Sequence, residues 1–240
     1  MSGARWRALL ILLAVVIALG AIGFAELRSR SSPFGERPLA ERPTLLLLTS
    51  LPLLFNEDFS LSGGGSAGLK RMQSRYRVVP ISVTSPSELE KGGLLLMAQP
   101  QAQTAENLVA LDQWVRRGGR VLIFADPMLE WPSKRSLGDL TRPPPMFADT
   151  GLLQHWGLRL AAPDQRGPTE RLLGGYKVST SSPGSLYGTC TITPDEFAAQ
   201  CATGKGRAMI VADADLLNVA EPNDPNLDAL LQELAELESN

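Results

Sequence analysis

The chain has 240 residues, a formal net charge of −2 and a pI near 5.6. Its lysine and arginine residues are scattered, so it lacks the electrostatic footprint of a nucleic-acid-binding protein. One histidine and two cysteines without zinc-type spacing exclude a histidine-rich metal centre and a zinc site of the usual kind.

The first predicted element is a transmembrane helix within residues 1–30. Residues 8–25 (ALLILLAVVIALGAIGFA) form an uninterrupted apolar run that follows Arg5 and Arg7. At 1.5 Å per residue the run reaches roughly 27 Å, just enough to cross the hydrocarbon core of a bilayer. The alternative is a cleaved signal peptide, because residues 23–25 (GFA) offer a small-x-small site. Both alternatives export the rest of the chain. We therefore expect a single-pass protein of the inner membrane, with a cytoplasmic N-terminus and a periplasmic main domain.

A polar, proline-bearing linker over residues 31–42 is expected to connect this anchor to one α/β domain over residues 43–240. Continuous apolar runs of strand length indicate strands that are covered on both faces. These runs lie at residues 44–49, 77–83, 94–98, 120–125 and 209–212. Pro80 predicts that the second strand is short or lies at a sheet edge, since proline cannot donate to the ladder.

Helices are expected where apolar residues recur every three or four positions and capping residues precede them. They lie near residues 69–76, 85–91, 104–117, 152–156 and 224–237. Pro194 is expected to open a further helix that contains Cys201, and a β region is expected over residues 174–193. Strands that alternate with helices in this way predict right-handed crossovers and a three-layer α/β sandwich with a mostly parallel sheet.

Two aspartate motifs follow predicted strands of this sheet. Asp126-Pro127 opens a long loop that runs to Asp149, and Asp213-Ala214-Asp215 follows the last strand. Open α/β sheets hold ligands at the carboxyl ends of their strands, so Asp126, Pro127, Asp213 and Asp215 are candidates for contacts with a ligand or partner.

If these carboxylates converge, they could bind a hard cation such as magnesium or accept hydrogen bonds from sugar hydroxyls. The alternative is that each aspartate caps a helix or organises a turn. We assign no catalytic residue, no metal ligand and no cofactor from these motifs.

The two cysteines, Cys190 and Cys201, are expected to form a disulfide, since an exported chain meets an oxidising compartment. The closed loop would contribute on the order of 2 to 3 kcal/mol. Two buried thiols are the alternative.

A glycine motif resembles a dinucleotide fingerprint without its context. Gly63, Gly65 and Gly68 have the GxGxxG spacing, but more than a dozen residues separate them in sequence from the strand that ends at Thr49. The fingerprint needs its first glycine directly after a strand, so dinucleotide binding is not the favoured interpretation.

The single histidine and the tryptophans have simple structural interpretations. His155 would need a nucleophile and an orienting acid to act as a base, and a helix-surface position is expected instead. Trp114 and Trp156 are expected in the core or at an interface, and Trp131 could offer a stacking face.

Four stretches of the sequence occur in an order that resembles a known family. They are LLLMAQP (94–100), LVALDQWVRRGGRVLIFADP (108–127), LLQHWGL (152–158) and GKGRAMIVADADLL (204–217). In this order they resemble the periplasmic domain of GldG-like auxiliary proteins of ABC transporters, which are related to DUF4350 proteins and similar to class I glutamine-amidotransferase-like folds.

The resemblance implies a membrane-tethered, non-catalytic binding or assembly module whose partners are subunits of an ABC transporter or envelope complex. Class I amidotransferases carry a nucleophilic cysteine after a central strand, but residues 97–100 (MAQP) occupy that place here. Amidotransferase activity is therefore not implied. The alternative function is a metal-dependent envelope hydrolase that uses Asp126, Asp213 and Asp215.

Overall fold

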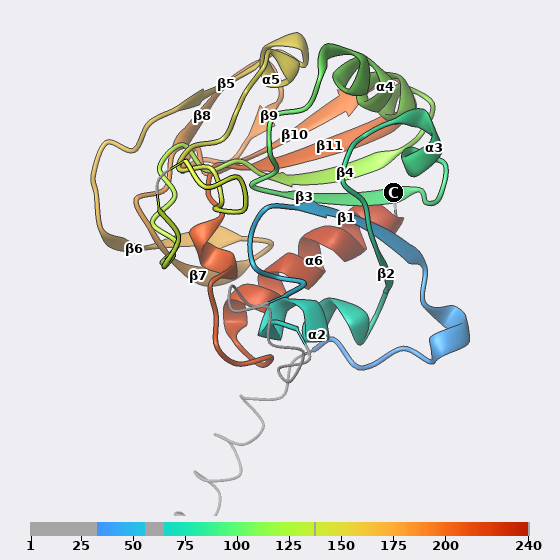
Figure 1. Cartoon of the computed structure of the whole chain (residues 1–240), viewed down its shortest axis with the longest axis horizontal. Coiled ribbons are helices and arrows are strands. Elements are labelled where there is room, and N and C mark those ends of the chain that lie inside the picture. The colour runs from blue at the N-terminus through green and yellow to red at the C-terminus, as the bar shows by residue number, and fades with distance from the viewer. Residues whose placement is uncertain (1–32, 56–64, 137, 240) are drawn as a thin grey trace, which may run out of the picture. The chain divides into compact units, whose positions relative to one another are not determined.

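The computed structural model describes residues 33–55, 65–136 and 138–239, and the chain from Phe34 onward forms one unit around a seven-stranded sheet (Figure 1). In chain order the elements are η1 (Leu39–Glu41), β1 (Thr44–Thr49), α2 (Ala67–Gln73), β2 (Arg77–Pro80), α3 (Pro86–Leu89), β3 (Leu94–Ala98), α4 (Ala105–Arg116), β4 (Arg120–Phe124), α5 (Leu152–His155), β5 (Leu158–Ala161), β6 (Pro168–Leu173), β7 (Tyr176–Ser181), β8 (Ser185–Gly188), β9 (Thr191–Ile192), β10 (Ala198–Thr203), β11 (Gly206–Val211), η3 (Asp215–Leu217) and α6 (Pro225–Ser239).

The main sheet is largely parallel, which confirms the predicted fold class. Its strand order is β2-β1-β3-β4-β11-β10-β9. The five strands from β2 to β11 pair in parallel, whereas β10 and β9 pair antiparallel. β11 is the last strand along the chain and lies between β4 and β10. Two short antiparallel pairs, β5 with β8 and β6 with β7, lie outside this sheet.

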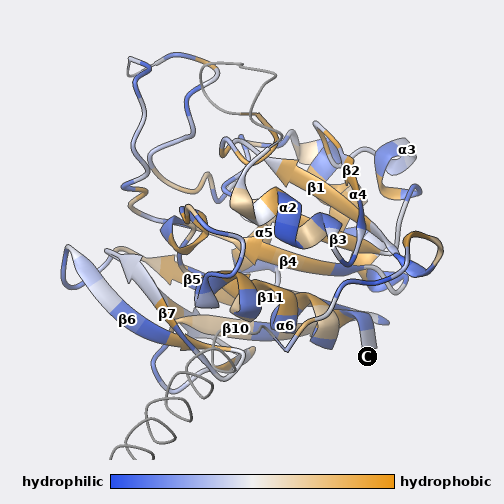
Figure 2. Ribbon diagram, turned by 90° about the horizontal axis from the view of Figure 1, so that it is seen from below, coloured by the Kyte–Doolittle hydropathy of each residue, from blue (hydrophilic) through white to orange (hydrophobic). Residues whose placement is uncertain are grey.

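Helices cover both faces of the sheet, and successive residues of each central strand pack against opposite faces. In β1, Leu45 and Leu47 belong to the core beneath α2 and α6, whereas Leu46 and Leu48 belong to the core beneath α3, α4 and α5. All four are buried, as burial on both faces requires. Figure 2 shows these central strands as hydrophobic and β6 as hydrophilic.

The predicted caps and apolar stripes of the two longest helices are confirmed. The Thr104 side chain accepts a hydrogen bond from the Asn107 amide at the start of α4. In α6 the predicted stripe is buried, and the helix contacts β4, β7 and β11. That stripe consists of Leu227, Leu230, Leu231, Leu234 and Leu237.

The strand prediction at Pro80 is also confirmed, because β2 has four residues, ends at Pro80 and lies at the sheet edge. The expected β region over residues 174–193 contains β7, β8 and β9. The sequence did not predict β5 and β6. Ser85 precedes α3, but its side chain makes no capping bond, and Glu88 pairs with Lys91.

The predicted helix after Pro194 is wrong, because these residues form a turn and then β10. Glu196 has φ +57° in this turn, and the Thr193 hydroxyl accepts a hydrogen bond from the Ala198 amide. β10 pairs with β11 along its whole length, and this tertiary pairing outweighs the helical propensity of its alanines.

The chain ahead of β1 packs onto the domain. Phe34 lies against the core that contains α6. The Arg37 amide donates to the Ser74 carbonyl, and its guanidinium pairs with Glu238 at 2.9 Å. The transmembrane helix predicted within residues 1–30 lies outside the described residues. In the part of the chain that the structure describes, no helix combines the length and apolarity needed to cross a membrane.

Candidate functional site

The register between β4 and β11 aligns two of the predicted site residues. Phe124 pairs with Val211 at the carboxyl ends of these parallel strands. Asp126 and Asp213 each stand two residues beyond this pair, so they leave the sheet side by side. Both side chains are fully buried. The sheet itself therefore builds this part of the site from adjacent strands that are distant in sequence.

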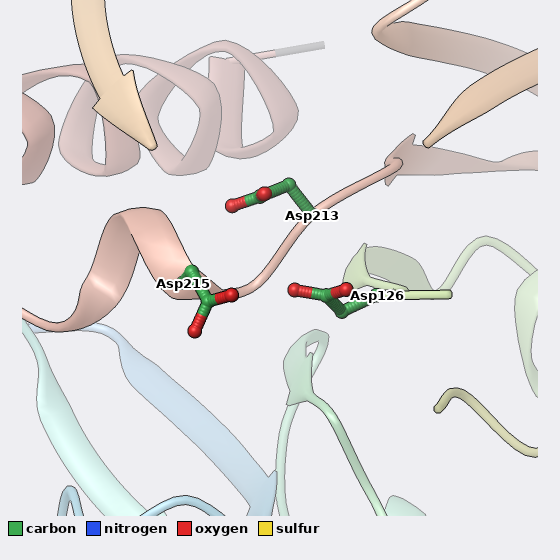
Figure 3. Close-up of side chains that lie close together, drawn as sticks. All are labelled: Asp126, Asp213 and Asp215. Atoms are coloured by element: carbon green, nitrogen blue, oxygen red, sulfur yellow. The ribbon is translucent and has the colours of Figure 1, made fainter. Parts of the chain in front are cut away.

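Asp215 completes a three-aspartate cluster with Asp126 and Asp213. It begins η3, which follows β11 after residues 212–214, and is half-buried. One carboxylate oxygen from each aspartate lies within 4.8 Å of the other two. Figure 3 shows the Asp126 carboxylate pointing toward Asp215, with Asp213 beside them. The structure thus brings together the three acids that the sequence predicts at the carboxyl ends of the parallel strands. We call this edge of the sheet the rim.

Backbone amides hold each of these carboxylates. Asp126 accepts from the Met128 amide at 2.7 Å and from the Ala214 amide at 2.9 Å. Asp213 accepts from the Leu216 amide at 2.9 Å, which organises the turn into η3. The sequence alternative, in which the aspartates shape turns, therefore holds alongside their convergence.

Asp215 instead fastens the long loop that follows β4. Its Oδ2 accepts a hydrogen bond from the Glu130 amide at 2.7 Å. The Glu130 carboxylate in turn accepts from the hydroxyls of Ser181 and Ser182, and these bonds lower its pKa. The loop is thus tied to η3 and to the end of β7.

Burial and mutual repulsion favour the neutral form of all three acids. Burial, with a smaller contribution from the Glu130 charge, raises the pKa of Asp126 to about 6. Burial and then the Asp126 charge raise the pKa of Asp215 to about 7. The same two causes raise the pKa of Asp213 well above its ordinary value. The cluster is therefore poised to hold protons or a cation near neutral pH.

Two buried oxygens in this region lack hydrogen-bond partners. They are Asp213 Oδ2 and the hydroxyl oxygen of Thr180 on β7. The Thr180 hydroxyl lies against Asp213 and partly offsets the rise in its pKa, but the two make no hydrogen bond of ordinary geometry. An unsatisfied buried polar group typically costs about 1 to 3 kcal/mol. Both atoms are oxygens, the kind of ligand atom that a hard cation prefers.

Gln99 is a buried residue that holds the neighbouring turn in place, a role that the sequence analysis did not predict. It follows β3 with φ +44°, a left-handed conformation that costs a non-glycine residue about 1 to 2 kcal/mol. Its amide accepts from the Asp126 N–H at 3.0 Å and donates to the Asp126 and Pro144 carbonyls. Gln99 therefore holds the loop that begins at Asp126 through hydrogen bonds to its backbone. No local sequence pattern indicates this role.

Pro127, the remaining rim candidate, makes a packing contact. A Cβ added at Gly184 would lie 2.5 Å from Pro127 Cγ, so this proline requires a glycine opposite it. Pro127 shapes the rim by steric contact.

The single histidine lies on the helix surface, as expected. His155 ends α5, and its side chain lies 3.5 Å from Asp112 of α4. Trp156 is buried and donates to Asp112 at 2.9 Å, and Trp114 is also buried. These observations confirm the structural interpretation of both tryptophans.

The predicted disulfide is present between Cys190 and Cys201. It joins the chain just before β9 to the middle of β10, and Cys201 is buried. Of the glycine motif, Gly63 lies outside the described residues. Gly65 and Gly68 flank the start of α2, well separated from the end of β1.

Comparison with known proteins gives one family match. The family described as "ABC-type uncharacterized transport system" matches residues 42–162, which run from just before β1 to just after β5. No curated protein matches the chain.

Comparison with solved structures gives similar chains at low sequence identity. The mmIFT52 N-terminal domain is 14% identical with a TM-score of 0.50, over 80% of this chain and 96% of that domain. An exo-β-1,4-mannosidase, Op5Man5 from Opitutaceae bacterium strain TAV5, is 12% identical with a TM-score of 0.49, over 83% of this chain. The chain spans 36% of that enzyme's length. A cytoplasmic protein from Salmonella typhimurium is 10% identical with a TM-score of 0.48, over 81% of this chain and 98% of its own.

Proposed function

The chain belongs to the family of ABC-type uncharacterized transport system proteins, and from this premise we propose that it is a membrane-tethered, non-catalytic assembly module of an ABC transporter. The family match over residues 42–162 carries the proposal, because it covers β1 to β4 and the whole loop that follows β4. Within the family we assign the chain to the GldG-like, DUF4350-related auxiliary proteins, on the four sequence stretches that resemble them.

The residue after β3 supports the non-catalytic part of the proposal. In class I amidotransferase-like folds this turn carries the nucleophilic cysteine, and the same place here holds Gln99. The Gln99 amide is buried, and its hydrogen bonds serve the backbone of the neighbouring loop. A side chain used in this way supports a structural role for the turn.

The loop after β4 is the surface that we propose for partner contact. Leu140 is 92% exposed and Met146 is 61% exposed, and both lie within the family match. Trp131 of the same loop lines a cavity of about 430 Å³ together with Lys70 and the segment 217–222. Exposed apolar side chains on a long loop are a feature of protein interaction sites.

The apolar run at residues 8–25 supports tethering in the inner membrane, with the domain on the periplasmic side. The disulfide between Cys190 and Cys201 agrees with this location, because disulfides persist in oxidising compartments. A domain held at the membrane in this way would meet the extracytoplasmic surface of a transporter.

Site-specific photocrosslinking in native membranes tests this function. A photoreactive amino acid replaces Leu140 in the full chain, and the crosslinked products are purified in detergent and identified by mass spectrometry. We expect subunits of an ABC transporter among these products.

The matched control carries the same photoreactive amino acid at Lys205. This exposed residue lies in the turn ahead of β11, at the opposite end of that strand from Asp213. Recovery of transporter subunits from position 140 but not from position 205 supports the proposal. Recovery of the protein alone from both positions contradicts it.

A further inference from the structure

We propose that Asp126, Asp213 and Asp215 form a calcium site at the carboxyl ends of β4 and β11, with the Thr180 hydroxyl as a further oxygen ligand. Such an ion would have a structural role: it would stabilise the rim and take no part in hydrolysis. The inference does not depend on the transporter proposal.

The separation of the carboxylate oxygens fits calcium. Two ligands of one ion can be no further apart than twice the metal–oxygen distance. This limit is about 5 Å for calcium and about 4.2 Å for magnesium. The three aspartate oxygens lie within 4.8 Å of one another, so their pairwise separations meet the limit for calcium. Magnesium also demands a nearly ideal octahedron, which a half-buried cluster of this width does not supply.

Backbone hydrogen bonds fix the carboxylates and leave oxygen lone pairs for an ion. The Leu216 amide holds Asp213 through Oδ1, and the Glu130 amide holds Asp215 through Oδ2. A carboxylate oxygen has two lone pairs, so Asp126 can also accept its two amide bonds and still bind a cation. The site is thus held in place before any ion arrives.

The unpartnered buried oxygens supply an independent sign of a missing ligand. The hydrogen bond that Asp213 Oδ1 accepts is explained by the turn into η3. Asp213 Oδ2 takes no part in this turn and is buried without a partner. Thr180 is 8% exposed, and its hydroxyl lies against Asp213 without a hydrogen bond of ordinary geometry to it. An ion at this point would satisfy both atoms. Asp215 is half-buried and marks the side from which the ion would enter.

Calorimetric titration of the full chain in detergent with calcium chloride tests the site. We expect a Kd of about 10⁻⁴ to 10⁻³ M, which is typical of extracellular calcium modules. Magnesium chloride should bind at least tenfold more weakly. At 10 mM calcium the melting temperature should rise by about 5 °C.

Three variants separate binding from folding. Asp215→Asn should weaken calcium binding at least tenfold, and Thr180→Val should weaken it several-fold. Asp213→Asn keeps the oxygen that bonds the Leu216 amide and cannot become charged inside the buried cluster. It should therefore melt no lower than the calcium-free wild type and should lose the calcium response.

Asp164→Asn is the matched control, because it removes one charge from an exposed aspartate outside the cluster. It should keep the full calcium response. Absence of calcium binding by the folded wild type up to 10 mM would overturn the proposal. The same follows if Asp215→Asn binds calcium as tightly as Asp164→Asn does.

Discussion

Glu233 places a carboxyl group between α6 and the turn that joins β6 to β7. It is 4% exposed, and burial, with a smaller contribution from the Glu236 charge, raises its pKa from 4.5 to about 7. The Gly174 amide in the turn donates to it and only partly offsets the effect. The folded protein therefore holds a proton at Glu233 that the unfolded chain releases more readily.

This difference predicts a pH-dependent stability. Between pH 4.5 and pH 7 the folded state binds more protons at Glu233 than the unfolded state, so stability falls as pH rises. The loss attributable to Glu233 should be about 3 kcal/mol, complete above pH 7. Asp126 and Asp215 add to the slope of the wild type. The contribution of Glu233 is therefore measured as the difference in urea unfolding between the wild type and Glu233→Gln at pH 5 and pH 8. Glu90→Gln, at an exposed site, should keep the wild-type slope.

Gln99 is the second residue whose environment predicts a measurable effect. Gln99→Ala removes the amide that clasps the loop after β4 and keeps the positive φ, so it should destabilise the domain by about 2 to 3 kcal/mol. Gln99→Gly loses the same bonds but relieves the backbone strain, and should be about 1 kcal/mol more stable than Gln99→Ala. Urea unfolding measures both values. Equal stability of the two variants would show that the left-handed turn carries no strain.

Residue by residue, the sequence predicted the members of the acid cluster but not its supports. Asp126 and Asp213 were found because each follows an apolar strand, and parallel strands end at one edge. Gln99 and Thr180 come from other segments, and Glu130 of the loop after β4 reaches Asp215 only through tertiary packing. No local pattern distinguishes such side chains from ordinary polar residues.

At the scale of elements, β11 starts in close contact with the end of α4. A Cβ added at Gly206 would lie 2.0 Å from the Val115 carbonyl oxygen and 2.2 Å from that of Gly119. Backbone atoms cannot move aside easily, so Gly206→Ala should destabilise the domain by about 3 kcal/mol or more. Gly93→Ala is the matched control, since its Cβ would meet no atom within 4 Å. Thermal unfolding of both variants checks this, and similar melting temperatures would contradict it.

Elements with a continuous apolar run or a strong helical period were predictable, whereas short and mixed elements were not. The apolar runs of β1, β3 and β4 and the leucine stripe of α6 can be recognised from the local sequence alone. β10 alternates between buried and exposed positions in its second half, but small residues carry that alternation, and Pro194 preceded it like a helix start. Pairing with β11 and β9 decided its structure, and such pairing is not visible in a local window.

At the scale of the whole molecule, the disulfide reports the compartment in which the chain folds. If the domain is periplasmic, Cys190 and Cys201 should resist alkylation in cells that are denatured directly in the reagent. Both should become modified after reduction, which mass spectrometry of the tryptic peptides detects. Alkylation of both thiols without reduction would place the folded chain in a reducing compartment. Expression without residues 1–30 provides the reduced control.

The position of β11 also sets the order in which the domain can be completed. β4 ends at Phe124, but its neighbour β11 begins only at Gly206. Until that last strand arrives, β4 keeps an open edge, and β10 has no place in the sheet. Chains that emerge N-terminus first therefore close the middle of the sheet only after β11 has emerged. The rim is finished only when β11 arrives, so a partner that recognises it would select chains in which the middle of the sheet is closed.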